Sequence, residues 1–563
     1  MKKFQQFCRY TACFLLCAGA FAGALKFGTL ATLPEITSFY PDSPVQWLLV
    51  TFPPHSFGIL AGTTLIAVLL SGVKLQCKWE ILLLALLPAV GAIAGYCNTP
   101  SLFRSGFYFN HFASCGAIIL AAGIYFADFP EKSRYLFASA AAGAAVTVII
   151  GVYQYCCGFE VMRNFIAAEI AAGKNISPEL LARINDTRVY STTCSGNIFA
   201  GYLLLISPLT AVVFFKAGRH FSPERLSSWC FGIAAALLCA AVFLATKTRG
   251  AFLAALATMT AAVLLSGQKK STKAVFTAIV IITIAGGAWY IQKCGRGFFS
   301  FAERADYCRT SLKMAASAPL AGHGWDSFQR QHMQVRKSRA AEAARDPHNV
   351  ILSFAAQCGI PAALSIAAIL LAAVIKLAKA RGISPENQAV FWGVAAYLCH
   401  SMMELNHLAP GIWTLAGTLT AGALAAEPCT IHKTLPKQCR NILLAALIFA
   451  AAAIIIQSSV ILKQDYALYD CQERFSTGKL QTLLQKYPRN PVIHEYAATI
   501  FMGSADLVNA EKHLLICLDL GASPANIWHK LAIIAGLRGD HSLETEFNQK
   551  ARFYYPAGYP ARP

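Results

Sequence analysis

Long apolar runs, separated by short polar or basic connections, dominate this sequence of 563 residues. A helix needs about 20 mostly apolar residues to cross a bilayer. By that measure the pattern predicts an all-α, polytopic membrane bundle of about 12–13 spans. We expect these spans at residues 10–31, 55–73, 79–97, 108–127, 134–157, 191–215, 227–246, 250–266, 273–292, 348–375, 388–405, 410–426 and 441–462.

The chain changes character after residue 463, where it becomes polar with a helical pattern. Pro491–Ile516 and Pro524–Tyr554 each begin with proline and combine a small-residue helix with an amphipathic one. Such pairs resemble tetratricopeptide repeats, which bind peptides or pack on their own protein. A plain helical cap on the membrane part is the open alternative.

These patterns divide the chain into three expected domains. Residues 1–130 would form N-terminal transmembrane helices, and 131–463 a transmembrane core. Within that core we expect long external loops at 158–190 and 293–347. Residues 464–563 would form a small extramembrane helical-repeat domain.

Composition supports the membrane interpretation, because 56% of the residues are hydrophobic and only 13% are charged. A soluble domain carries about 25% charged residues. The net charge of +20 could indicate a nucleic-acid partner. Its basic residues lie in short loops between apolar runs, however, which is typical of membrane topology. We therefore expect contact with membrane lipids and none with nucleic acid.

The basic residues also predict the orientation, since cytoplasmic loops are enriched in lysine and arginine. The short loops on the opposite side hold only Arg104, Lys247 and Arg249. The N-terminus is therefore expected in the cytoplasm, with the long loops and the C-terminal tail outside. The basic set comprises Lys2, Lys3, Arg9, Lys74, Lys78, Lys132, Arg134, Lys216, Arg219, Arg225, Lys269, Lys270, Lys273, Lys376, Lys379, Arg381, Lys433, Lys437 and Arg440.

Most of the 19 cysteines lie within apolar runs, where cysteine serves as a small apolar filler. Two pairs in external segments could form disulfides in an oxidising compartment. They are Cys294 with Cys308 and Cys471 with Cys517.

Three polar features are expected at the outer membrane face. Arg188 precedes one span, and Asn197 follows in the first turns of that helix. Arg249 lies with Lys247 in a tight turn between two spans. His348 sits in Asp346-Pro347-His348-Asn349, where a polar loop enters an apolar run.

This combination suggests handling of a phosphate-bearing lipid. The planar fork of arginine suits phosphate oxygens, and two arginines could stabilise a diphosphate leaving group. A histidine could take the proton of an incoming hydroxyl. The simpler alternative is that Arg188 and Arg249 contact lipid headgroups and that His348 anchors its helix.

Other polar residues are weaker candidates. Substrate binding could involve Asn197, Lys247, Asn349 and Arg345. Of these, Arg345 belongs to a basic stretch in the second long loop. A further set near the outer end of a predicted span, His400, Glu404 and His407, could form a proton or metal site. We favour a simpler interpretation, in which these residues form a polar helix end that lines the same cavity. No H-E-x-x-H or D-x-D spacing occurs, so no metal or cofactor is expected.

Four segments carry a family resemblance: RVYSTTCSGNIFAGYLLLISPL, TKTRGAFLAALATM, APLAGHGWDSFQ and DPHNVILSFAAQCGIPAAL. Over residues 130–425 the chain resembles the O-antigen ligase and O-antigen polymerase superfamily of bacterial envelope glycosyltransferases. The resemblance implies a many-spanning, metal-independent, inverting transferase in the bacterial inner membrane. Its donor would be an undecaprenyl-diphosphate-linked glycan, used at the periplasmic face. The acceptor hydroxyl would belong to lipid A core, a growing glycan or a protein.

The resemblance also assigns roles to residues of this chain. Arg188 and Arg249 would bind the lipid diphosphate, and His348 would act as the base. Two departures from the family pattern stand out: the segment after Arg188 reads STTCSGN and keeps only the final Asn197, and Thr248 replaces the usual serine before Arg249.

Three functions remain open. A ligase would transfer the glycan to lipid or protein, whereas a polymerase would extend it on the carrier. A polysaccharide transporter would form no bond, but the clustering of polar groups at one face suits an enzyme better. A tail outside the membrane slightly favours the ligase.

Overall fold

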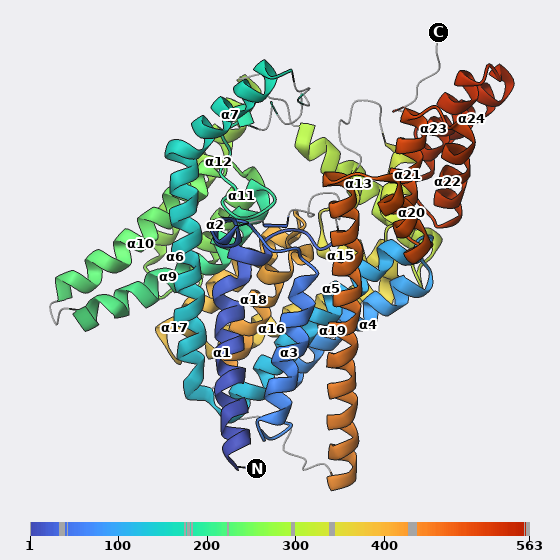
Figure 1. The fold of residues 1–563 in the computed structure, drawn as a ribbon. Coiled ribbons are helices and arrows are strands. Elements are labelled where there is room, and N and C mark those ends of the chain that lie inside the picture. The colour runs from blue at the N-terminus through green and yellow to red at the C-terminus, as the bar shows by residue number, and fades with distance from the viewer. Residues whose placement is uncertain are drawn as a thin grey trace. The chain divides into compact units, whose positions relative to one another are not determined.

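The computed structural model describes residues 2–32, 40–41, 43–173, 176, 181, 184–221, 225–293, 299–336, 344–425, 436–556 and 558. Within these ranges the elements are helices joined by turns, without a strand, as predicted (Figure 1). Eight of the described helices are long and apolar enough to cross a membrane. Two shorter apolar helices, Ser56–Leu70 and Arg249–Leu264, accompany them.

The chain forms two compact units. The first comprises Met1–Leu86, Ala113–Gly287 and Ala368–Ser458. The second comprises Leu87–Phe112, Ala288–Ala367 and Ser459–Pro563. The three-domain division expected from the sequence stays a prediction.

Apolar helices make up most of the first unit, and small residues let several of them approach closely. A Cβ at Gly143 would overlap the carbonyl oxygen of Phe21, and one at Gly411 would overlap that of Gly23. These glycines bring α1 against α6 and α18, as close helix packing in membranes requires. Its helices are α1 (Lys2–Phe27), α2 (Pro44–Leu49), α3 (Ser56–Leu70), η2 (Pro130–Lys132), α6 (Ser133–Tyr153), η3 (Gln154–Gly158), α7 (Phe159–Ala171), α9 (Gly196–Phe221), α10 (Arg225–Ala245), α11 (Arg249–Leu264), α17 (Pro385–Ser401), η4 (Asn406–Leu408) and α18 (Pro410–Leu424), with parts of α4 (Trp79–Cys97), α5 (Leu102–Asp128), α12 (Lys270–Lys293), α16 (Ile360–Ala380) and α19 (Lys437–Glu473).

The second unit holds the remaining parts of those five helices and the long loop before His348. That expected loop contains two helices of its own, α13 (Phe299–Ser317) and α14 (Ser327–Val335). The following helix α15 (Val350–Cys358) is short. The tail adds α20 (Thr477–Lys486), α21 (Pro491–Gly503), α22 (Leu507–Asp519), α23 (Pro524–Leu537) and α24 (His541–Tyr554).

One predicted span was wrong: residues 348–375 do not form a continuous helix. The chain breaks at Gly359, which has a φ of +95°, and α16 begins at Ile360. A side chain at Gly359 would overlap the carbonyl oxygen of Leu320, and the Ile360 amide donates to Pro319 at 2.7 Å. In the sequence, the signal for this break was Gly359 with Pro361 two residues later.

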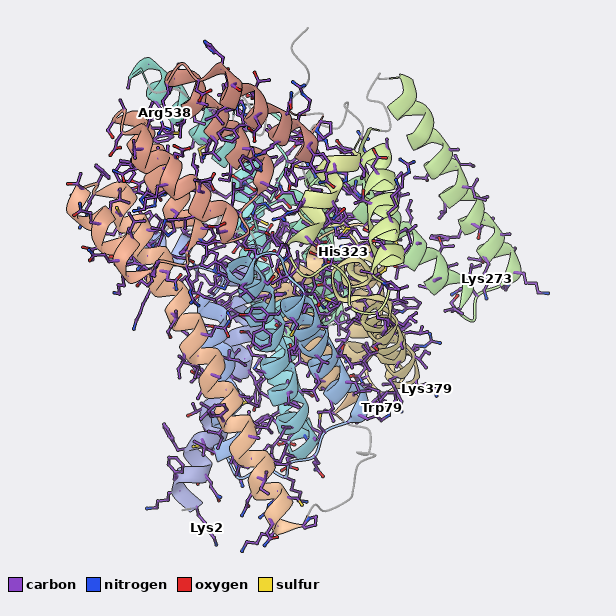
Figure 2. All side chains as sticks on the ribbon, turned by 90° about the vertical axis from the view of Figure 1, so that its right-hand side faces the viewer. Lys2, Trp79, Lys273, His323, Lys379 and Arg538 are labelled. Atoms are coloured by element: carbon purple, nitrogen blue, oxygen red, sulfur yellow. The ribbon has the colours of Figure 1, made fainter. Side chains whose placement is uncertain are left out.

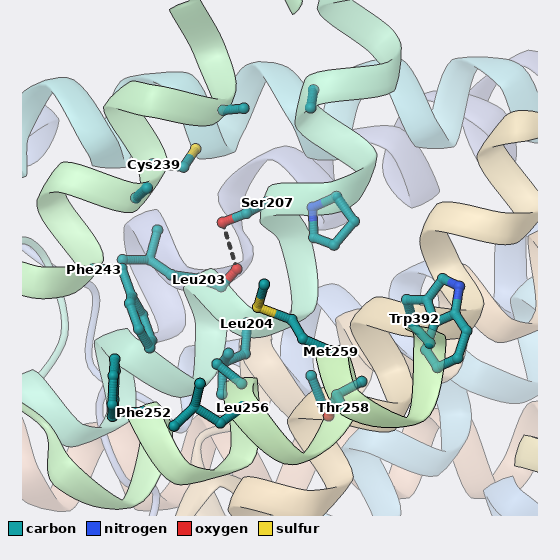
Figure 3. A pocket seen from close by; sticks show the side chains of 17 residues that line it. Leu203, Leu204, Ser207, Cys239, Phe243, Phe252, Leu256, Thr258, Met259 and Trp392 are labelled. Carbon is teal, nitrogen blue, oxygen red and sulfur yellow. Dashed lines mark hydrogen bonds between the residues drawn. The ribbon is translucent and has the colours of Figure 1, made fainter. Parts of the chain in front are cut away.

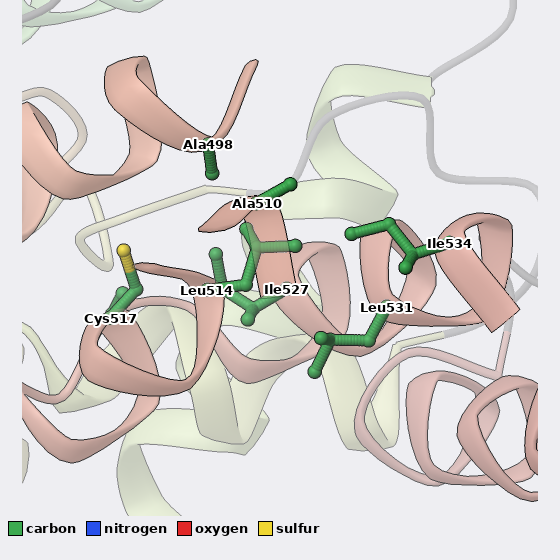
Figure 4. Packing of buried hydrophobic residues seen from close by; sticks show 8 residues of the cluster. Ala498, Ala510, Leu514, Cys517, Ile527, Leu531 and Ile534 are labelled. Carbon is green, nitrogen blue, oxygen red and sulfur yellow. The ribbon is translucent and has the colours of Figure 1, made fainter. Parts of the chain in front are cut away.

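The tail consists of helical hairpins, as its sequence pattern predicted, with α21 to α24 lying side by side (Figure 1). One apolar cluster joins α22 to α23 through Leu514, Ile527 and Leu531 (Figure 4). Charged residues such as Arg538 remain on its surface (Figure 2). The resemblance to tetratricopeptide repeats stays a prediction.

Contacts within the second unit hold the tail against its own chain. Gly521, at a φ of +77°, lies so close to the Pro100 carbonyl that a side chain there would overlap it. The Arg330 side chain donates to the Gly521 carbonyl at 3.5 Å, and the Arg336 guanidinium lies 5.0 Å from the Tyr555 ring. Packing on its own protein, one of the two expected roles of the tail, therefore has direct support.

Cys471 and Cys517, which the sequence suggested could form a disulfide, do not form one, because both thiols are free and buried. They belong to different apolar clusters, one around Leu480 and the other around Leu514. The Cys517 thiol instead donates to the Pro491 carbonyl. Cys294, the expected partner of Cys308, lies outside the described residues.

Candidate functional site

In the first unit, Arg188 bonds residues from two separate parts of the sequence, the start of α9 and the turn before α11. Its Nη2 donates to Asn197 Oδ1 at 2.5 Å and to Thr248 Oγ1 at 3.3 Å. Its Nε donates to the Thr246 carbonyl at 3.1 Å. Because Asn197 lies in the first turn of α9 and Thr248 caps α11, two helix starts converge on this guanidinium.

Glu404 completes this arrangement, which we call the arginine cluster: Arg188, Asn197, Thr248 and Glu404. The carboxylate is 3% exposed and accepts a hydrogen bond from Asn197 Nδ2 at 2.7 Å. Asn197 therefore faces the cation with its oxygen and the carboxylate with its amide nitrogen. From the sequence, Glu404 was expected at a polar helix end lining the same cavity, but no role in the site was assigned to it.

The two other basic residues near the cluster differ in their contacts. Lys247 Nζ donates to the Asp186 carbonyl at 2.5 Å and to Thr187 Oγ1 at 2.9 Å, so it binds the loop before α9. Arg249 is exposed and forms no hydrogen bond or ion pair with any residue that the structure describes. Of the pair, Arg249 is the cation available to an anionic ligand.

His348 belongs to the second unit, two residues before α15. Its ring stacks on Tyr307 of α13, with 5.4 Å between centroids. Asn349 Oδ1 accepts the amides of Ile351 and Leu352 at 2.9 Å and so caps α15. This cap accounts for the oxygen of Asn349, which the sequence analysis had considered for substrate binding.

Asp346 is a carboxyl group buried beneath the His348 backbone, with 1% exposure. It accepts hydrogen bonds from Ser353 Oγ at 2.5 Å and Gln357 Nε2 at 3.3 Å. Burial raises its pKa to about 6, although these hydrogen bonds and His348 act in the opposite direction. Arg345, just before it, is half-buried.

The Gly-rich turn before α14 shapes the same region. Trp325 is fully buried, stacks on Tyr108 at 4.5 Å and donates from Nε1 to the Ala92 carbonyl at 3.1 Å. The Gly324 amide donates to the Gln357 carbonyl at 2.9 Å, which ties the turn to α15. These contacts hold the turn that precedes His348 in the sequence against the helix that follows it.

Strained backbone accompanies the candidate motifs. Six described residues other than glycine have a positive φ, and only Ala505 lies in the tail. Such conformations cost about 1–3 kcal/mol and tend to occur at functional sites. Aspartate and histidine adopt a positive φ more often than most residues, so the residue types offered a weak signal at two of the six positions. Besides Ala505, the residues with a positive φ are Thr187, Ser191, Lys247, Asp326 and His348.

The groups expected at one face thus fall into two sets. Arg188, Asn197 and Arg249 belong to the first unit, and His348 to the second. His400 bonds the Asn406 amide at 2.9 Å, rather than joining Glu404 in a ligand set. Among the described residues no group of three or more His, Cys, Asp or Glu could hold a metal ion.

A comparison with known protein families gives a match. Residues 234–367, which include Arg249 and His348, match the family described as O-antigen ligase. The match supports placing the chain in the O-antigen ligase superfamily. It supports a multi-pass membrane glycosyltransferase of the ligase or polymerase type, with lipid-linked glycan substrates. No curated protein matched the chain.

Replacing Glu404 with alanine should destabilise the protein by about 1–3 kcal/mol, because it leaves the partly buried Asn197 amide without its acceptor. Thermal unfolding in detergent measures this loss. Glu160→Ala, at an exposed position of α7, should change stability by less than about 0.5 kcal/mol. Equal unfolding temperatures for both variants would contradict the importance of the Glu404 contact.

Asp346 should make stability depend on pH. The pKa of Asp346 is raised from 3.8 to about 6, so the stability gained from the protonated carboxyl is complete below pH 3.8 and is lost as pH rises through 6. Over this range the free energy of unfolding should fall by about 2–3 kcal/mol. Asp346→Asn should remove this pH dependence, so the unfolding temperature of the variant should rise relative to that of wild type between pH 4 and 7. Asp519→Asn, at an exposed position, is the control, and parallel profiles for Asp346→Asn and wild type would refute the expectation.

Proposed function

We propose that this protein is an O-antigen ligase-type glycosyltransferase. It would move a glycan from undecaprenyl diphosphate to a hydroxyl of lipid A core or a protein at the periplasmic face of the inner membrane. The observation that carries the proposal is the arginine cluster, with exposed Arg249 on the helix that Thr248 caps. Two guanidinium groups next to helix starts suit a diphosphate.

An apolar cavity adjoining the cluster supports a lipid-linked donor. It has a volume of about 440 Å³ and lies among α9, α10, α11 and α17 (Figure 3). Leu203 and Leu204 line it and follow Asn197 on α9 by about two turns. Phe252 lines it one turn after Arg249. A diphosphate held at the arginines could therefore place the first part of its isoprenoid chain in this cavity.

The mechanism follows from charge. When the acceptor oxygen attacks the anomeric carbon, the bond to the lipid diphosphate breaks and negative charge grows on the leaving oxygen. Arg188 and Arg249 would stabilise that charge, and Asn197 with Glu404 would keep Arg188 in place. His348 would take the proton of the acceptor hydroxyl. Attack opposite the leaving group inverts the anomeric centre, and no metal or cofactor is required.

The same chemistry would serve a polymerase that extends the glycan on its carrier. A tail able to hold a protein acceptor favoured the ligase in the sequence analysis. Since the tail packs on its own chain through Gly521 and Arg330, that reason is weakened. Polymerase activity therefore remains the alternative, and the transfer assay must distinguish it from ligase activity.

Purified protein should transfer glycan from a native lipid-diphosphate donor, and Arg249→Ala and His348→Ala should each lower the rate at least about 100-fold. Arg163→Ala and His541→Ala are controls at exposed positions and should keep full activity. Acceptor-dependent product indicates a ligase, and longer glycan on the carrier a polymerase. Unchanged rates in both site variants would disprove the assigned site. Absence of wild-type turnover with intact donor and acceptor would contradict the proposed activity.

Narrowing the apolar cavity should weaken the use of long-chain donors. Ala255→Phe places a ring in the cavity, so the KM for an undecaprenyl donor should rise about 10-fold, while that for a short-chain prenyl donor stays unchanged. Ala257→Phe is a matched control, because Ala257 lies on the same helix, is exposed and does not line the cavity. Equal effects of Ala255→Phe on both donors would exclude the cavity as the chain site.

A further inference from the structure

A second cavity lies in the first unit where α1 begins and α5 ends. Its volume is about 780 Å³, within the range of small-ligand sites. No step of the proposed glycan transfer uses it. Basic, amide and aromatic side chains dominate its lining, which comprises Lys2, Gln5, Gln6, Arg9, Tyr10, Cys13, Tyr125, Phe129, Glu131, Lys132 and Tyr135.

The cavity carries excess positive charge. Lys2, Arg9 and Lys132 face a single acid, Glu131. None of the three cations forms an ion pair with a residue in the described part of the chain. An anion entering this cavity would therefore meet three cations and a single carboxylate.

Two of the cations are held in place by neighbouring groups. Arg9 Nε donates to the Ser71 carbonyl at 3.0 Å, and its guanidinium lies 5.5 Å from the Phe129 ring. Lys132 Nζ lies 5.4 Å from the Tyr135 ring. The Arg9 contact uses one donor, which leaves the terminal nitrogens of the guanidinium for a ligand.

The surface beside the cavity is suited to lipid. Phe7, Tyr10 and Phe14 are 66%, 66% and 69% exposed on α1. Their spacing of three and four residues places them on one face of the helix. Aromatic rings are enriched where membrane helices meet the headgroup layer. Lys2 marks the free end of α1 (Figure 2), which the charge bias of the loops predicts to be cytoplasmic.

We propose that this cavity binds the phosphate-bearing headgroup of an anionic phospholipid from the cytoplasmic leaflet. The unpaired cations would bind the phosphate, and the amides of Gln5 and Gln6 could donate further hydrogen bonds. The exposed aromatic face of α1 would contact the acyl chains. The proposal concerns the opposite end of the helices from the expected transfer site and does not depend on the proposed glycan transfer.

The test measures phosphatidylglycerol binding to the purified full chain in detergent by native mass spectrometry, with phosphatidylcholine as the uncharged comparison. Wild type should prefer phosphatidylglycerol. Lys2→Gln/Lys132→Gln should weaken its binding roughly 30-fold, since each lysine near a membrane surface contributes about 5-fold. Lys3→Gln/Lys379→Gln removes the same charge from exposed positions outside the cavity and should leave binding nearly unchanged.

Three results would overturn the proposal. They are equal affinity for the two lipids, equal losses in the two double variants, and displacement of the bound lipid by excess inorganic phosphate. The first two would indicate no site or nonspecific attraction, and the third a site for free phosphate. Unfolding temperatures measured without added lipid should match between the double variants, which shows that lost binding is not lost folding.

Discussion

A buried carboxylate held opposite an arginine is the interaction on which the candidate site depends. The Asn197 side chain bonds both groups: its oxygen accepts a hydrogen bond from Arg188, and its nitrogen donates one to Glu404. Removing charge from water is costly unless partners compensate for the loss. Here the compensation comes through an amide whose two ends have opposite polarity, so each charge fixes the orientation that the other requires.

This arrangement has a consequence for substrate binding. Arg188 is half-buried and already bonded, whereas Arg249 is exposed and free of protein partners in the described residues. A fixed cation loses little entropy when it binds a phosphate, and a mobile one can adapt to the ligand. Under the proposed function, Arg188 would define the position of the diphosphate and Arg249 would follow it.

The second unit achieves rigidity by other means. The break at Gly359 shortens α15, and Asn349 caps its opposite end. Trp325 and Gln357 then hold the Gly-rich turn against this short helix. As a result His348 sits at the edge of a small, tightly bonded block rather than at the end of a long span. Its positive φ is tolerated because the surrounding contacts determine the backbone.

Sequence alone determined the helical membrane character, because runs of apolar residues have few alternatives in a bilayer. It also predicted a helical tail and, through a resemblance, the residues Arg188, Arg249 and His348. Only tertiary structure revealed that Glu404, more than 200 residues away, bonds Asn197. It also decided that Cys471 and Cys517 stay apart and that the span at 348–375 is broken. Hydrophobic periodicity reports the environment of each segment, whereas such contacts depend on which helices meet and on how closely their backbones approach.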